Sequence, residues 1–90
     1  MSSVTRKGDN CTGHGSYGAV PLISGSDNVL INDKPCGRVG DQYSPHGSHS
    51  DIISKGSDTV FVNGIPIARV GDSVSPDGTV ANGSPNVTAG

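Results

Sequence analysis

An Asn-Gly pair between two apolar, β-branched runs is the feature that most constrains what this chain can fold into. The runs are residues 59–62 and 65–70, and Asn63-Gly64 separates them. This pattern predicts a β-hairpin with a type I′ turn, because both central residues of that turn need a positive φ.

An earlier copy of the pattern occupies residues 28–39, with Asn32-Asp33 at its turn. Each copy has a proline at the same place on its returning strand, Pro35 in the first and Pro66 in the second. Proline has no N–H to donate to a strand ladder. We therefore expect each returning strand at the edge of its sheet, or with the missing donor facing solvent.

Two half-motifs of this hairpin each occur three times. Gly-Ser-x-x-Val begins at residues 25, 56 and 83, and Arg-x-Gly-Asp begins at residues 6, 38 and 69. The chain opens with the second half and closes with the first, so we expect the last strand to pair with the first and close a ring of three units. The units would run near 9–41, 41–72, and 72–90 closing onto 1–9. A plain tandem repeat with unpaired ends is the alternative.

The repeated charged and proline positions have two interpretations. They are Arg6, Asp9, Pro35, Arg38, Asp41, Pro66, Arg69 and Asp72. The arginines and aspartates could form a catalytic array. Repetition in triplicate favours a structural role instead, with each arginine hydrogen-bonded to carboxylates or carbonyls where units meet.

The composition predicts one small all-β domain over residues 1–90. Hydrophobic residues make up only 31% of the chain and aromatic residues 3%, while glycine occurs 14 times and proline 6 times. Glutamate is absent and no stretch has a 3.6-residue apolar period, so we expect little or no helix. Such a chain buries little surface and needs a staple or a partner.

Charge and hydropathy exclude several classes of protein. The net charge is −2 and the basic residues are dispersed, which disfavours binding to nucleic acid. No apolar run approaches the length of a transmembrane helix, and the polar start does not resemble a signal peptide. We expect synthesis in the cytoplasm without a standard export signal, where the two cysteines would be thiols or ligands rather than a disulfide.

Two loops carry all the histidines and one of the cysteines. Cys11-x-x-His14 lies in the first loop and His46-x-x-His49 in the second. Together they supply four nitrogen and sulfur ligands, the number that a closed tetrahedral zinc site needs.

Other interpretations of these residues stay open. The histidines could be solvated side chains of glycine-rich loops, and Asp77, which stands five residues after Asp72 as His14 does after Asp9, could replace Cys11 or His49. Cys36 occupies the strand position of Ile67, so we interpret it as a small buried apolar residue. A Cys11–Cys36 disulfide is a further alternative.

The segments Pro35-Cys36-Gly37-Arg38 and Pro66-Ile67-Ala68-Arg69, within the repeated pattern, resemble the Pro-Ala-Ala-Arg motif of PAAR-repeat proteins. The resemblance covers nearly the whole chain and implies a small pointed cone of short β-hairpins with pseudo-three-fold symmetry. It also implies one metal ion near the vertex, zinc with iron as the alternative, held by three His and one Cys. Those ligands fall on Cys11, His14, His46 and His49.

The same resemblance implies a function. PAAR-repeat proteins cap the trimeric β-helical spike of contractile injection machines, the VgrG-type spike of type VI secretion or the central spike of a phage tail. We therefore expect a non-enzymatic tip, one chain per trimer, delivered outward on contraction and touching the target membrane transiently. No effector domain is expected within the chain, so any effector would be a separate protein. The alternatives are a zinc-dependent hydrolase, disfavoured because no glutamate is available as a general base, and a small metal-stabilised protein-binding regulator.

Overall fold

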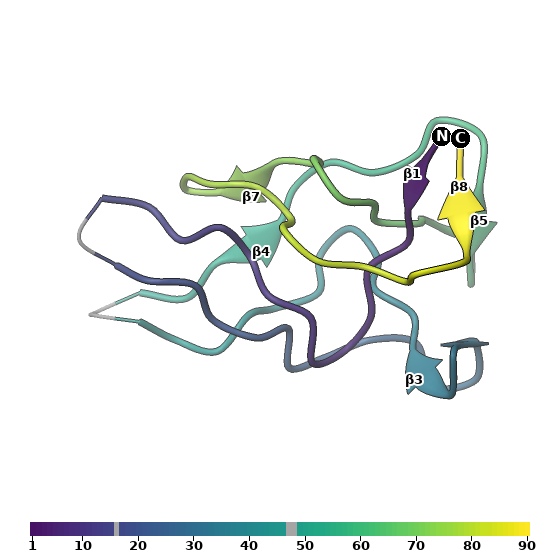
Figure 1. Cartoon of the computed structure of the whole chain (residues 1–90), viewed down its shortest axis with the longest axis horizontal. Coiled ribbons are helices and arrows are strands. Elements are labelled where there is room, and N and C mark those ends of the chain that lie inside the picture. Colours follow the sequence, from purple (N-terminus) through teal and green to yellow (C-terminus); the bar gives the residue numbers. More distant parts are fainter. Residues whose placement is uncertain (16, 47–48) are drawn as a thin grey trace.

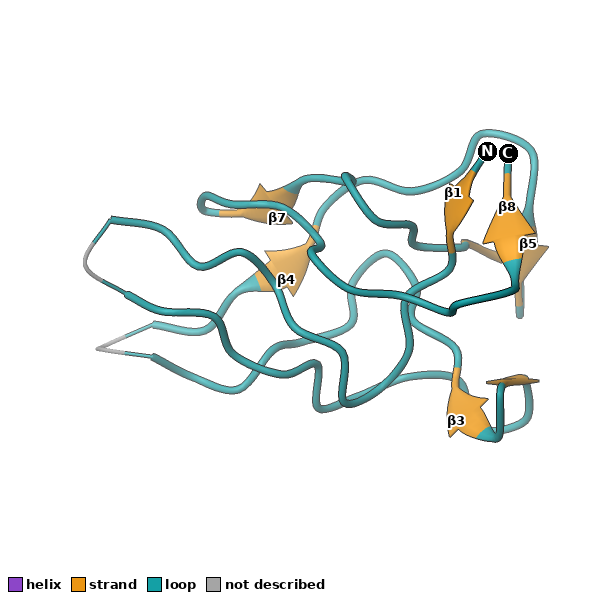
Figure 2. Cartoon of the chain, in the orientation of Figure 1, coloured by secondary structure: helices purple, strands orange, loops and turns teal. Residues whose placement is uncertain are grey.

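The fold consists of short antiparallel strands joined by long loops (Figure 2). A computed structural model describes residues 1–15, 17–46 and 49–90. Each strand has two residues: β1 (Ser2–Ser3), β2 (Leu30–Ile31), β3 (Lys34–Pro35), β4 (Ile52–Ile53), β5 (Phe61–Val62), β6 (Ile65–Pro66), β7 (Val74–Ser75) and β8 (Thr88–Ala89). The predicted all-β class is confirmed. The described residues form no helix, and thus none that could cross a membrane.

Three hairpins with the same register lie at one end of the molecule (Figure 1). Ile31 pairs with Lys34 in β2–β3, and Val62 pairs with Ile65 in β5–β6. The predicted type I′ geometry is present at both turns, where the four central residues have φ between 54° and 76°.

The third hairpin joins the two ends of the chain. β1 pairs with β8 in the register Ser2↔Ala89, as the repeat predicts. The termini therefore lie side by side (Figure 1). Gly90 and Met1 stand where the other hairpins have their two central turn residues, so the third hairpin lacks only one peptide bond to match them.

The strands are shorter than the apolar runs that predicted them. After Ser3, Pro35 or Pro66, each returning strand leaves its own hairpin and bridges to the returning strand of another unit. The bridges are Val4↔Arg69, Arg6↔Cys36 and Arg38↔Ile67. The second half of each run is thus used to close the ring rather than to lengthen a hairpin.

Equivalent residues of the three units also form the core beneath the hairpins. Val4, Cys36 and Ile67 are at most 5% exposed and lie in one cluster with Val62 and Ala89. The cluster is flanked by the valines of the Gly-Ser-x-x-Val motif, residues 29, 60 and 87. Cys36 is thus a buried apolar residue, as its alignment with Ile67 predicts.

A second core cluster lies toward the loops. It contains Cys11, Tyr43 and Val74, each of which follows its Gly-Asp pair by two residues, together with Leu22, Ile53, Ala68 and Val80. The longest dimension of the molecule is 32 Å, against 23 and 22 Å for the others. Along it, the hairpins form one end, and residues 10–15, 17–20, 42–46 and 49–50 of the loops extend toward the other (Figure 1).

Candidate metal centre

In each histidine loop, two residues three positions apart in the sequence lie opposite one another. His46 and His49 are bridged by reciprocal backbone hydrogen bonds, with N···O distances of 3.0 and 3.4 Å. His14 and Tyr17 are bridged in the same way, at 3.0 and 2.9 Å. Directly opposed residues of an antiparallel pair project from the same face. Each bridged pair therefore directs its two side chains to one side.

Asp51 joins the group because it projects to the same side of the chain as His49. It follows His49 by two residues in extended chain, and its carbonyl accepts a hydrogen bond from the Tyr43 N–H at 2.9 Å. Side chains at i and i+2 of an extended segment share a face. Asp51 is fully buried and projects toward the histidines.

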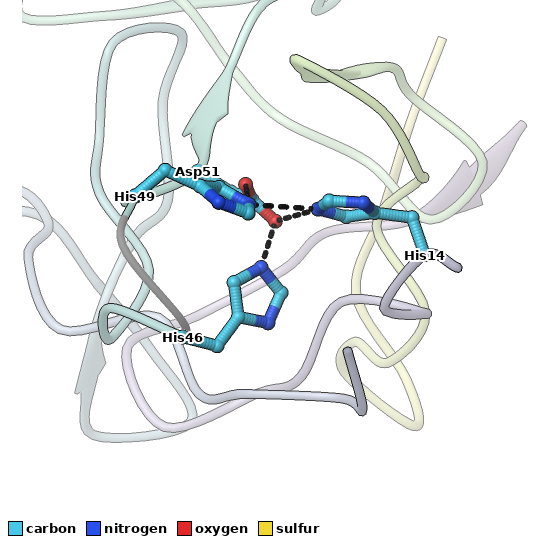
Figure 3. Close-up of side chains that lie close together, drawn as sticks. All are labelled: His14, His46, His49 and Asp51. Atoms are coloured by element: carbon cyan, nitrogen blue, oxygen red, sulfur yellow. Dashed lines mark hydrogen bonds and ion pairs between the residues drawn. The ribbon is translucent and has the colours of Figure 1, made fainter. Parts of the chain in front are cut away.

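The four side chains converge on one point (Figure 3). His46 Nε2 lies 2.9 Å from Asp51 Oδ2, and His14 Nε2 lies 3.4 Å from the same oxygen. His49 Nε2 lies 3.4 Å from Asp51 Oδ1 and 3.1 Å from His14 Nε2. A tetrahedral site with bonds near 2.1 Å requires ligand atoms about 3.4 Å apart. The four separations given above are at or below that value, and one donor atom from each residue lies within 4.8 Å of the others.

The chemistry of the donors favours a cation at this point. The carboxylate of Asp51 has no exposed side-chain surface, and its Oδ1 has no hydrogen-bond partner among the described residues. A buried charge is stable only when it is paired. His46 Nδ1 lies 3.2 Å from the Gly18 carbonyl, so in the neutral ring a proton on Nδ1 leaves the Nε2 lone pair facing Asp51. A metal ion would satisfy both the lone pair and the carboxylate.

The structure brings three of the four predicted ligands together and leaves the fourth apart. Cys11 is 1% exposed, lies in the loop-side core and is not in the group of convergent donors. Its backbone bridges to Val80, and its side chain packs in the loop-side core rather than among the histidines. Asp51 stands in its place. The sequence signal for Asp51 is its position two residues after His49. The two side chains share a face only if the chain is extended from residue 49 onward, which the sequence alone does not establish.

The other candidate residues have structural positions. The carboxylate of Asp77 accepts a hydrogen bond from the Gly78 N–H and does not belong to the histidine group. Each arginine of the triplicated motif binds the aspartate three residues later, and the closest such contact, between Arg6 Nε and Asp9 Oδ2, is 2.8 Å. Both cysteines are free thiols.

A family model described as the PAAR motif matches residues 44–90, just over half of the chain. The chain belongs to the PAAR-motif family. The matched segment contains His46, His49 and Asp51, the complete β5–β6 hairpin, and the β8 strand of the third hairpin. Membership supports a structural, spike-tip role in contractile injection systems in general. No match was found among curated proteins.

Proposed function

We propose that this PAAR-motif chain caps the three-fold β-helical spike of a contractile injection machine, with one chain on each trimer and no catalytic activity. The observation that carries the proposal is the ring of three hairpins in identical register at one end of the molecule. A single chain can match a three-chain partner only if it presents three similar surfaces.

Exposed apolar side chains support the proposal that the hairpin end is the docking surface. Leu30 and Phe61 occupy equivalent positions of two hairpins, and each is 55% exposed. The equivalent residue of the third hairpin is Thr88. Large exposed apolar side chains at repeated positions are characteristic of an interaction surface.

The opposite end would be held by one metal ion, zinc with iron as the alternative. His14, His46, His49 and Asp51 would bind it, and the ion would join the two loops and neutralise the buried carboxylate. The need for such an ion follows from the small apolar core. Structural zinc in small modules contributes on the order of 10 kcal/mol of folding free energy. Four protein ligands also leave no open position of the kind that a catalytic zinc requires.

Co-purification with a trimeric β-helical spike tests the docking surface. The wild-type chain should elute with the trimer, in a ratio of one copy to three spike chains. A Leu30→Asp, Phe61→Asp double variant should lose the trimer, whereas Lys55→Asp, a change of charge outside the hairpins, should keep it. Retention of the trimer by the double variant would contradict the proposed face.

Elemental analysis of protein purified without added metal tests the second half of the proposal. We expect one ion per chain, and His14→Ala should lose it. A chain that carries no metal and melts at the same temperature with and without a chelator would contradict the metal centre. A pure structural tip should also show no hydrolytic activity with its metal bound.

A further inference from the structure

Tyr17 is the aromatic counterpart of His49 in the first loop. The segments His14-Gly15-Ser16-Tyr17 and His46-Gly47-Ser48-His49 stand at the same distance after Asp9 and Asp41. Their end residues are bridged in the same way, His14 to Tyr17 and His46 to His49. The backbone that brings His49 to the centre therefore brings a phenol ring to it from the other loop.

The ring of Tyr17 contacts the whole group of imidazoles. Its centroid lies 5.6 Å from that of His14, 5.1 Å from that of His46 and 5.0 Å from that of His49. The three imidazole centroids are themselves 4.9 to 5.0 Å apart. The four rings thus lie against one another, with centroid separations of 4.9 to 5.6 Å.

Exposure shows which side of the centre remains open. The side chain of Asp51 is fully buried, and those of His46 and His14 are 8% and 13% exposed. His49 is 29% exposed, and Tyr17 as a whole residue is 37% exposed. Solvent therefore reaches the group from the side where Tyr17 and His49 lie together. A ring at this position limits the approach of water or a chelator.

We propose that Tyr17 is a positioning residue that shields the metal centre and holds its coordination number at four. The inference rests on the proposed metal centre. The apolar ring stands where a fifth ligand would have to approach the ion. The equivalent position of the second loop carries His49, which is one of the four donors. The ring would slow exchange of the ion, and the hydroxyl is not required for either effect.

Metal release to an excess of a chromogenic chelator tests the shield. Tyr17→Ala should release the ion on the order of tenfold faster than wild type while still binding one ion per chain. Tyr17→Phe, which keeps the ring and removes only the hydroxyl, is the matched control and should release at the wild-type rate. Equal release rates for wild type and Tyr17→Ala would overturn the shield. So would fast release by Tyr17→Phe.

The Co²⁺-loaded protein tests the coordination number without depending on release. Four-coordinate Co²⁺ absorbs visible light much more strongly than six-coordinate Co²⁺. Wild type and Tyr17→Phe should give the strong spectrum, and Tyr17→His, which places a further imidazole at the position equivalent to His49, should give a weaker one. An unchanged spectrum for Tyr17→His would overturn the fifth-ligand position of Tyr17. A wild-type chain that binds no ion overturns the metal centre itself, and the role of Tyr17 with it.

Discussion

The hairpin end and the loop end are built from the same three repeats, yet only the hairpin end repeats strictly. At the hairpins, the register and the Arg–Asp pairs recur in all three units, and so does a serine cap, in which the motif serine hydroxyl accepts a hydrogen bond from the N–H of the motif valine. At the loops, the positions of His14, His46 and Asp77 are equivalent but their surroundings differ. The second loop supplies three of the four convergent donors, the first supplies one and the third supplies none.

This difference separates two kinds of constraint. A surface that meets a three-fold partner benefits from three equal units, so substitutions that break the equality are unfavourable. A metal ion needs four donors around one point, and three equal loops cannot supply four. The loss of symmetry at the loops is therefore what the proposed ion requires.

The largest expected effect comes from breaking the ring at the hairpin end. Deleting residues 84–90 removes β8, the buried Ala89 and the serine cap of the third hairpin, and leaves β1 as an open edge. We expect loss of cooperative thermal unfolding, measured by circular dichroism. The control is a permutant in which Gly90 is joined directly to Met1 and the chain is opened between Asn63 and Gly64. It contains all three hairpins and should fold. A harmless truncation would contradict the closed ring.

The next largest effect distinguishes the two residues that could be the fourth ligand at the loop end. Asp51→Asn keeps the shape of the side chain but removes the charge, so it should lose the ion and its contribution to stability. Cys11→Ala should keep the ion and destabilise the protein by about 1 kcal/mol through loss of core packing. Metal content and melting temperature measured on both variants decide the matter. Loss of metal from Cys11→Ala with retention in Asp51→Asn would reverse the assignment.

A smaller effect concerns the hydrogen bonds that join the units at the hairpin end, which differ among the three arginines. Arg6 binds Asp9 and also donates from Nη1 to Asn32 of another hairpin at 3.0 Å, and Arg38 reaches Asn63 in the same manner at 3.4 Å. Arg69 binds Asp72, and the position equivalent to those asparagines is Gly90.

Replacement of these arginines by lysine should therefore have unequal effects. Lysine cannot reproduce the fork of a guanidinium. We expect Arg6→Lys to lower the free energy of unfolding by about 2 kcal/mol and Arg69→Lys by about 1 kcal/mol, since one more hydrogen bond is lost in the first. Chemical denaturation measures both. Equal losses would mean that the contact with Asn32 contributes nothing.

The last expected effect is a dependence on pH in the hairpin-side core. Burial raises the pKa of the Cys36 thiol from its ordinary 9.0 to about 11. The neutral thiol is favoured by folding, so its contribution is complete below pH 9 and is lost as the pH rises from about 9 to about 11. The difference in stability between wild type and Cys36→Ala, measured across this window, should shrink with pH. A constant difference would contradict the raised pKa.

The hairpins could be predicted from the sequence because their determinants are local. The φ requirement of an Asn-Gly turn, the missing N–H of proline and the repetition of Gly-Ser-x-x-Val act within a few residues. The pairing of β1 with β8 followed from counting half-motifs, although the paired residues lie at opposite ends of the chain. The length of the strands did not follow, because bridges between units decide where a hairpin ends.

The metal centre was only partly accessible from the sequence. A Cys11–His14 pair and a His46–His49 pair were expected there, and the three histidines do converge. Which further donor joins the histidines depends on the direction of the side chains near them in the sequence. These side chains point either toward the histidines or into the core. Cys11 faces the core because it is equivalent to Tyr43 and Val74, each two residues after its Gly-Asp pair. Asp51 faces the histidines because it lies two residues after His49 and so on the same face of the chain. The sequence thus determines the turns, whose energetics are local, while the side to which each loop residue points is decided by packing among units distant in the chain.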